Sequence, residues 1–450
     1  MIFTSKIFLL VAIVVLILNL VFRRVRQRQL IFLLASYTFY VFFDFRFFWL
    51  LLVISLISFI FGILIYRKKS RFLLTFIGIA LIIFFIAFFK LQLYFNFTNS
   101  ADKILLPLGI SFYSFQAISY LVDVYRGKLL PEKKIIVFLL YISFFPQLVA
   151  GPIERGKNLI PQITRLPFPS NGQIILGLKQ IVYGYFLKIV VSDNLNDVTF
   201  LLLNDNFNIS KITGLILFYF QIYFDFHGYT NIAVGLANIF GIKLNQNFRL
   251  PFLAKSIKDF WHRWHISLST WFKDYLYIPL GGSKSKNKSI VILIVFSVSG
   301  VWHGPTYNFL LWGVYNGIIY LVEDMLNRYI KIKNKTISTI VVFFLISFGW
   351  LFFYYNSLDQ IKNVLLNLIF GSWENSFSYL KVFVINNLIV LQILILAIYL
   401  NINEFRYIYN FNAQGKRMML VLNYFLFDIL IVLIILFGFL GNKEFVYFRF

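Results

Sequence analysis

Runs of apolar residues about as long as a membrane is thick constrain this 450-residue chain more than any other feature. A helix needs roughly 20 apolar residues to cross about 30 Å of hydrocarbon, and an open sheet would strand backbone polar groups in lipid. Charged residues make up 13% of the chain, against roughly a quarter in soluble domains. The sequence therefore predicts an all-α, polytopic integral membrane protein. The clearest spans are Ile7 to Phe22, Phe72 to Phe89, Thr336 to Tyr354, Val382 to Leu400 and Met418 to Leu440.

Three further apolar stretches are too long or too irregular for one simple span. Leu30 to Tyr66 predicts a helical hairpin. Pro107 and Gly109 predict a kinked or partly re-entrant helix over Ile104 to Tyr125. Polar residues within Thr213 to Ile239 predict two short helices that meet in the membrane. Counting all these segments predicts about ten to twelve crossings, with no internal repeat and no separable soluble domain.

The chain carries 42 Lys and Arg against 18 Asp and Glu, a net charge of +24, and the position of these cations indicates their partner. They cluster in short loops between apolar runs, as at Arg67 to Arg71, Lys284 to Lys288 and Arg328 to Lys335. Such loops are expected on the cytoplasmic side, next to anionic headgroups, so the excess predicts membrane lipids and not nucleic acid as the partner. Cysteine is absent, which excludes disulfides and thiolate metal sites.

The segment from Phe260 to Tyr275 sets histidines among aromatic, cationic and hydroxyl side chains. As one helix it would have an aromatic stripe and an opposite polar face. The stripe is Trp264, Leu268, Trp271 and Tyr275, and the polar face is Lys258, His262, His265 and Ser269. An interfacial membrane anchor has the same pattern and is the alternative to a functional site. No metal site is predicted, because no cysteine or carboxylate partner completes a zinc set with His262 and His265.

A second histidine, His303, lies between the apolar runs Ile290 to Val301 and Phe309 to Val322. An intramembrane histidine is by default a functional hypothesis, because a polar ring is costly at that depth. A structural histidine hydrogen-bonded across helices is the alternative. All four histidines of the chain lie between His227 and His303, which confines any histidine chemistry to this region.

Six segments, in order, resemble the membrane-bound O-acyltransferase family, and more narrowly its bacterial branch of alginate and peptidoglycan O-acetyltransferases. They are PLGISFYSFQAISYLVDVYRG from Pro107, FPQLVAGPIER from Phe145, YFDFHGYTNIAVGLANIFGI from Tyr223, FWHRWHISLSTWFKDYLYIPLGG from Phe260, GVWHGPTYNFLLWG from Gly300 and FVYFRF from Phe445. The resemblance implies one transmembrane domain over residues 1–450, with a signature-bearing core at about 104–322. It also implies a ring of tilted and re-entrant helices around a thin central tunnel.

The resemblance also implies roles for the two histidines. His303 matches the catalytic histidine of the family, and His265 matches the second family histidine. We expect His303 to act as general base, and His265 to orient the acyl donor or stabilise the developing oxyanion. An acyl-histidine intermediate is the variant mechanism. At His227, His262 and Asn231 the chain departs from the residues common in the family, so the polar contacts near these positions are expected to differ in detail.

The implied donor is cytoplasmic acetyl-CoA, used as a substrate, with no bound cofactor. Trp264 and Trp302 are expected to pack around the acyl site. Ser269, Arg263 and Lys273 are further candidates for donor binding, with membrane anchoring as the alternative for the two cations.

Two other functions compete with O-acetylation of an alginate-like polysaccharide or peptidoglycan. D-alanyl transfer to teichoic acid from a carrier protein is one, and the YLYIPLGG ending at Gly282 favours acetylation over it. A lipid or acyl transporter is the non-enzymatic alternative, but it would typically have internal repeats. The resemblance further implies a multi-pass protein of the bacterial cytoplasmic membrane that works with a separate, extracytoplasmic SGNH-hydrolase-like partner.

Overall fold

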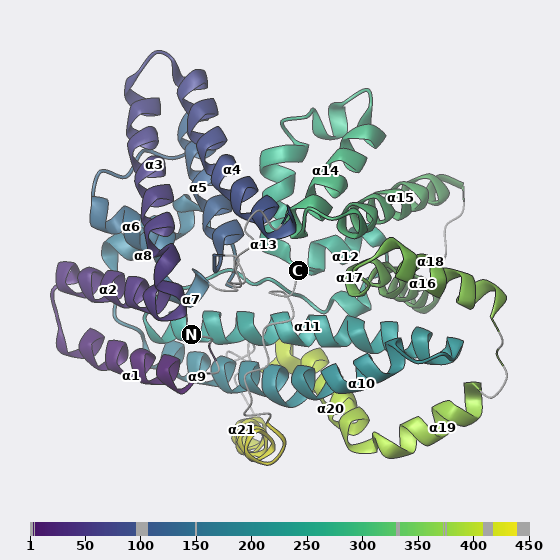
Figure 1. Cartoon of the computed structure of the whole chain (residues 1–450). Coiled ribbons are helices and arrows are strands. Elements are labelled where there is room, and N and C mark those ends of the chain that lie inside the picture. The colour runs from purple at the N-terminus through teal and green to yellow at the C-terminus, as the bar shows by residue number, and fades with distance from the viewer. Residues whose placement is uncertain are drawn as a thin grey trace. The chain divides into compact units, whose positions relative to one another are not determined.

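The computed structural model describes residues 3, 5–95, 107–148, 151–329, 334–371, 373, 376–407 and 417–438. Within these ranges every regular element is helical (Figure 1). The expected all-α fold is thus confirmed. The resembling segment FVYFRF from Phe445 and parts of the loop Arg328 to Lys335 lie outside the described residues.

The chain forms two compact units. Unit 1 comprises Met1–Ile181, Thr230–Gln246 and Lys273–Tyr275, and unit 2 comprises Val182–Tyr229, Asn247–Phe272 and Leu276–Phe450. The single domain inferred from the resemblance stays a prediction, as do the ring of helices and its central tunnel.

Unit 1 is built mainly from the first nine helices. They are α1 (Lys6–Val21), α2 (Val25–Asp44), α3 (Phe48–Arg67), α4 (Arg71–Phe95), α5 (Ile110–Tyr125), α6 (Ile135–Ser143), α7 (Phe145–Leu148), α8 (Gly156–Arg165) and most of α9 (Asn171–Tyr185). A short 3₁₀ turn, η1 (Phe45–Phe47), separates α2 from α3, so the stretch Leu30 to Tyr66 forms two helices as predicted. The two helices run in different directions in Figure 1 and do not lie side by side as a hairpin would.

Unit 2 holds the remaining helices. They are η2 (Phe186–Ser192), α10 (Asp193–Leu203), α12 (Ile257–Arg263), α13 (Ile266–Phe272), α14 (Lys288–His303), α15 (Tyr307–Tyr329), α16 (Lys335–Gly349), α17 (Leu351–Tyr354), α18 (Leu358–Phe370), α19 (Ser376–Asn386), α20 (Leu388–Tyr407) and α21 (Arg417–Phe437), with the short turns η3 (Pro251–Leu253) and η5 (Gly282–Lys284). Both units include parts of α9, α11 (Asn208–Ile239) and η4 (Lys273–Tyr277).

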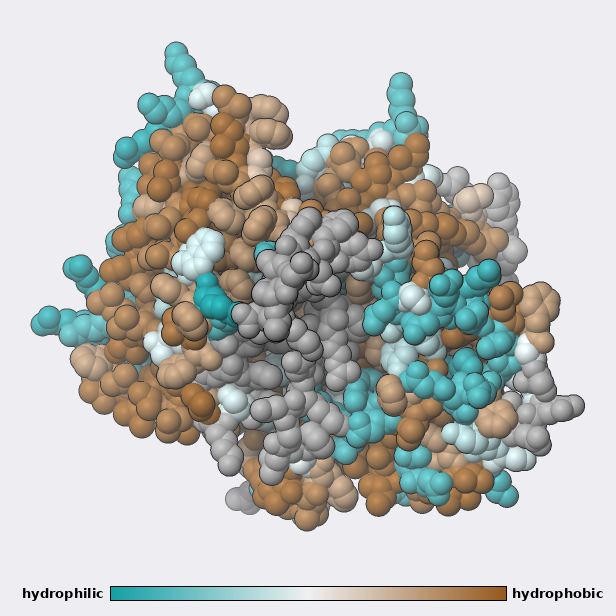
Figure 2. Space-filling view, in the orientation of Figure 1, coloured by the Kyte–Doolittle hydropathy of each residue, from teal (hydrophilic) through white to brown (hydrophobic). Residues whose placement is uncertain are grey.

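Several of these helices suit a bilayer. Among the described residues, five are long and apolar enough to span one, and the pair α19 and α20, bent by 78°, makes a sixth if it counts as one span. Apolar side chains cover the outer surface of α3 and α4, while the tip of this hairpin, the cationic loop Arg67 to Arg71, is hydrophilic (Figure 2). Exposed rings such as Phe72 and Phe84 are expected where lipid is the solvent. The chain is therefore a multi-pass membrane protein.

The region around α5 differs from its prediction. Gly109 adopts a left-handed conformation, with φ at 67°, and caps the start of a helix that runs unbroken to Tyr125. A side chain at Gly109 would collide with the carbonyl of Leu148. Pro107 and Gly109 thus precede the helix, and the predicted kink is absent from Ile110–Tyr125. Residues 104–106 of the predicted segment lie outside the described residues.

The prediction of two short helices over Thr213 to Ile239 is wrong, because α11 runs continuously for 32 residues. Its polar side chains are satisfied by neighbouring helices, so the backbone need not break. The Tyr223 hydroxyl donates to Asn401 Oδ1 at 2.8 Å, and the Asp225 carboxylate pairs with Lys188.

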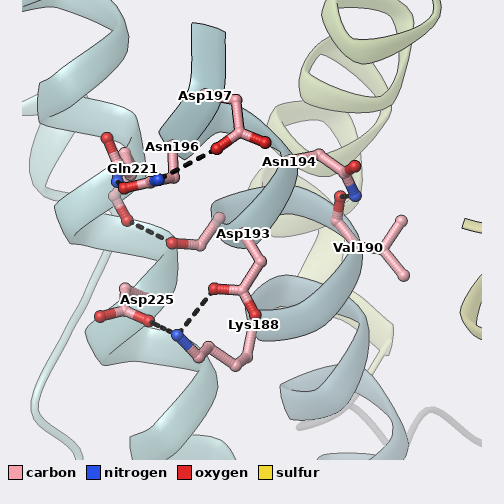
Figure 3. A network of polar contacts seen from close by, with 9 residues as sticks. Lys188, Val190, Asp193, Asn194, Asn196, Asp197, Gln221 and Asp225 are labelled. Carbon is pink, nitrogen blue, oxygen red and sulfur yellow. Dashed lines mark hydrogen bonds and ion pairs between the residues drawn. The ribbon is translucent and has the colours of Figure 1, made fainter. Parts of the chain in front are cut away.

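The Lys188 ion pairs join η2, a π-helical turn, to α10 and α11 (Figure 3). Lys188 Nζ lies 2.8 Å from Asp193 Oδ1 and 2.7 Å from Asp225 Oδ1, and all three side chains are buried. In the same view, Gln221 Nε2 donates to Asn196 Oδ1 at 3.0 Å. Within the apolar span Asn171–Leu203, Lys188 is buried only because carboxylates surround it.

Candidate active site

His303 is the last residue of α14, at a turn that reverses the chain into α15. The two helices pack backbone against backbone near this turn. Gly300 permits that approach, because a Cβ atom there would collide with the carbonyl of Phe309. The helical hairpin therefore fixes the backbone that carries His303.

The His303 ring lies within an aromatic box supplied by three helices. Ring centroids of Trp302, Phe353 and Trp312 lie 4.6, 5.0 and 5.1 Å from the imidazole, and that of Phe309 lies 6.3 Å away. Trp312 and Phe353 meet the imidazole edge to face, at 84° and 75°. His303 is buried, with 8% of its surface exposed. The imidazole therefore lies among aromatic rings with little access to water.

His265 lies at a break between two short helices, so the single amphipathic helix predicted over Phe260 to Tyr275 is wrong. The structure has α12 and α13 instead, and His265 between them is left-handed, with φ at 41°. The preceding loop causes the break. Asn247 O accepts from the Ile266 N–H at 2.8 Å, and the Arg249 N–H donates to Arg263 O at 2.9 Å, which diverts backbone groups from a continuous helix.

The break turns His265 inward and leaves His262 exposed. His265 is 2% exposed, and its ring lies 4.7 Å from Phe226 at an angle of 90°. Burial lowers the pKa of His265 to about 3, so its imidazole is neutral at any physiological pH. A neutral imidazole has one N–H donor and one acceptor nitrogen.

Trp302 contacts both histidines. Its ring centroid lies 4.6 Å from that of His303 and 6.4 Å from that of His265. The predicted site residues His265, Trp302 and His303 are thereby brought together in unit 2.

Trp264 belongs to the same aromatic cluster but is not adjacent to His303. It stacks on Phe260 at 5.6 Å and lies 5.2 Å from Trp350, which in turn lies 6.2 Å from Trp312 of the His303 box. The structure thus places Trp264 at a second layer of rings behind the histidine.

The three polar candidates are dispersed. Ser269 is committed to the α12 to α13 break, where its hydroxyl donates to Trp264 O at 3.1 Å. Arg263 pairs with Asp259 at 2.8 Å, one turn earlier on α12. Lys273 is exposed and belongs to unit 1. Ser269 and Arg263 are thus engaged at α12 and the break that follows it.

Sequence reasoning missed Trp312, Phe353 and Phe226, which line the two imidazoles. The sequence around these residues is rich in aromatic side chains, but apolar spans in general are too, so this feature did not single them out. His227 was noted only as a departure; it stacks on Tyr223 at 5.3 Å, with an interplanar angle of 12°.

An all-helical membrane protein with two buried histidines meeting at one indole is compatible with acyl transfer, and comparison with known proteins defines its class. The chain belongs to the membrane-bound O-acyltransferase family, whose sequence profile matches residues 32–358. It is accordingly an O-acyltransferase.

Relatives of known name fall into three groups. The chain is 31% identical to the "Probable alginate O-acetylase AlgI" of Pseudomonas aeruginosa, over 84% of this chain and 76% of that protein. It is 32% identical to the "Peptidoglycan O-acetyltransferase" of Helicobacter pylori, over 59% of this chain and 57% of that protein. It is 31% identical to the "Teichoic acid D-alanyltransferase" of Bacillus subtilis, over 55% of this chain and 68% of that protein.

Proposed function

We propose that this protein transfers acetyl groups from cytoplasmic acetyl-CoA for O-acetylation of an extracytoplasmic polysaccharide, alginate-like or peptidoglycan, in a bacterial cytoplasmic membrane. Support for acetylation comes from relatives named as O-acetylases. The alignment with one of them covers 84% of this chain, at 31% identity. The observation that carries the chemistry is the meeting of His265 and His303 at Trp302.

His303 acts as the general base in this proposal. It takes the proton from the acceptor hydroxyl while the oxygen attacks the thioester carbonyl. A C–O bond forms, the C–S bond breaks, and the proton passes from His303 to the departing thiolate, so the imidazole returns to its neutral form. The aromatic box suits this role because it holds the ring in one orientation and limits its hydration.

His265 assists as a neutral group. Its low pKa excludes an imidazolium, so it would stabilise the oxyanion or orient the donor through one N–H. Trp302 packs against both imidazoles, and Trp264 contributes to the aromatic cluster through its contact with Trp350. Ser269, Arg263 and Lys273 remain proposed contacts of the donor, with Arg263 first having to share its pairing with Asp259.

Two partners complete the proposal. Membrane lipids surround the apolar helices, and an extracytoplasmic SGNH-hydrolase-like protein with a nucleophilic serine completes transfer to the polymer. D-alanyl transfer is the second candidate, supported by the relative named for it. It requires an acylated carrier protein in place of acetyl-CoA.

The test uses purified protein in proteoliposomes with radiolabelled acetyl-CoA, and measures release of free CoA and transfer of label. His303→Ala should lower the rate about 10²- to 10⁴-fold, the usual contribution of a general base. His262→Ala is the matched control, because that histidine is exposed on α12. Near-normal turnover in His303→Ala would refute the base assignment, and no turnover without a carrier protein would favour D-alanyl transfer.

A further inference from the structure

Two arginines of unit 1 share one tyrosine ring. The guanidinium carbon of Arg155 lies 4.9 Å from the Tyr275 ring centroid, and that of Arg126 lies 5.6 Å from it. The three residues come from separate segments: the C-terminal cap of α5, the loop before α8, and η4. We call Arg126, Arg155 and Tyr275 the arginine–tyrosine cluster.

Polar contacts hold this cluster in place. The Tyr275 hydroxyl donates to Asp123 Oδ2 at 2.9 Å, which fixes the ring. Arg126 Nη1 donates to the Asp274 carbonyl at 3.0 Å. Two guanidinium groups are thereby held against one ring before any ligand arrives, which lowers the ordering cost of binding.

Arg155 places directional donors in the cluster. It is 7% exposed, and a guanidinium carries five N–H donors. Its Nη1 donates to the Ile153 carbonyl at 3.3 Å. Guanidinium N–H groups form strong, charge-assisted hydrogen bonds to anionic oxygens.

The hydrogen bonds of the adjacent carboxylate, Glu154, go to Asn245. Its oxygens accept from the Asn245 backbone N–H at 2.6 Å and from the side-chain amide at 2.9 Å. The charge of Glu154 still interacts with Arg155 and offsets part of the positive charge of the cluster.

Exposed lysines add to the local positive charge. Lys128, Lys157 and Lys273 each lie two residues from a member of the cluster, and all three are exposed. They provide a field that attracts anions, while the buried guanidinium provides directional donors.

We propose that the arginine–tyrosine cluster binds a phosphate group. Planar guanidinium forks match phosphate oxygens, and the exposed lysines around them favour an anion over a neutral ligand. Such a group has two sources here: the nucleotide part of a thioester donor, which rests on the proposed function, or the headgroup of an anionic phospholipid.

The experiment measures equilibrium binding to the full-length protein in detergent, in a His303→Ala background so that turnover cannot interfere. The probes are CoA and dioctanoyl phosphatidylglycerol, with phosphate-free pantetheine and dioctanoylglycerol as comparators. Arg126→Gln and Arg155→Gln should each weaken at least one phosphate probe about tenfold or more, and leave both comparators unchanged. Arg165→Gln, an exposed arginine at the end of α8, is the matched control.

The outcomes separate the two sources. Loss of CoA binding alone identifies the nucleotide, and loss of phosphatidylglycerol binding alone identifies the lipid; both support the site. Wild-type-like binding of both probes by the double variant would overturn it, as would a parent protein that binds neither. If Arg155→Gln fails to fold, Arg155→Lys, which keeps the charge but loses the fork, and the half-buried Arg126→Gln carry the test.

Failure of this inference and failure of the proposed function look different. If the arginine variants bind both probes normally, and the protein that keeps His303 transfers acetyl groups, the phosphate site is rejected and the proposed function stands. Absence of acetyl transfer with arginine-dependent lipid binding would remove the proposed function and keep the site.

Discussion

The imidazole of His265 and the indole of Trp302 lie 6.4 Å apart, centroid to centroid, at an interplanar angle of 62°. The first residue lies at a helix break and the second near the end of α14. Trp302 also contacts His303, so both imidazoles pack against one indole. A change at Trp302 should therefore alter how the histidines cooperate before it alters the fold.

Replacing Trp302 tests this role. Trp302→Ala should lower kcat by about 10²-fold, since a displacement of about 1 Å can cost that much, while Trp302→Phe, which keeps a ring, should lose much less. Steady-state kinetics with acetyl-CoA measures both variants, and thermal unfolding checks their stability. Trp373→Ala, at an exposed tryptophan, is the control. Equal kinetics for the Ala and Phe variants would remove Trp302 from the site.

The buried imidazole of His265 should make stability depend on pH. Burial lowers its pKa from 6.5 to about 3. Between these two values the unfolded chain binds a proton at His265 and the folded chain does not. The contribution is fully present above pH 6.5 and is lost as the pH falls from 6.5 toward 3, by at most about 4 kcal/mol.

Thermal unfolding in detergent, from neutral pH to about pH 4, measures this loss. His265→Gln should flatten the decline, whereas His262→Gln should not, because His262 is exposed. Parallel pH profiles for His265→Gln and the parent would contradict the buried, neutral state.

Lys188 should be more important for stability than a surface lysine. Lys188→Met would leave the Asp193 and Asp225 carboxylates buried without their cation, and should destabilise the protein by about 3–5 kcal/mol. Adding Asp193→Asn and Asp225→Asn to the same chain should recover much of that loss, because no uncompensated charge remains. Denaturant or thermal unfolding measures the stability of the parent, of Lys188→Met and of the triple variant.

The control for this prediction is Lys288→Met. Lys288 pairs with Asp324 at 3.0 Å, but both side chains are more than a third exposed, so the cost should stay below about 1 kcal/mol. Similar losses for Lys188→Met and Lys288→Met would show that burial adds nothing to the Lys188 pairs.

Gly300 should be intolerant of any side chain. Gly300→Ala forces α14 away from Phe309 and should cost about 1–3 kcal/mol, with loss of activity because His303 moves with the helix. Gly172→Ala is the control, since the nearest atom to an added Cβ there is Ser170 Oγ at 3.9 Å. Melting temperature and turnover are measured together, and full activity in Gly300→Ala would separate helix packing from the site.

The order of the amino acids was enough to assign the class of this protein. Apolar runs of span length excluded a soluble or open-sheet fold, and the division of Leu30 to Tyr66 into two helices followed from its length alone. The segments around His265 and His303 indicated both the family and the two histidines. These features depend on local composition and order, which a chain carries without folding.

Only the tertiary structure decided where helices break and what surrounds the histidines. The α12 to α13 break depends on the Asn247 carbonyl, which accepts from Ile266, and on the Arg249 N–H, which donates to Arg263. The continuity of α11 depends on Lys188 and Asn401, which contact its polar side chains. The box around His303 draws Phe353 from a helix 50 residues away in the sequence. Such contacts join residues distant along the chain, and hydrophobic periodicity reports only the near ones.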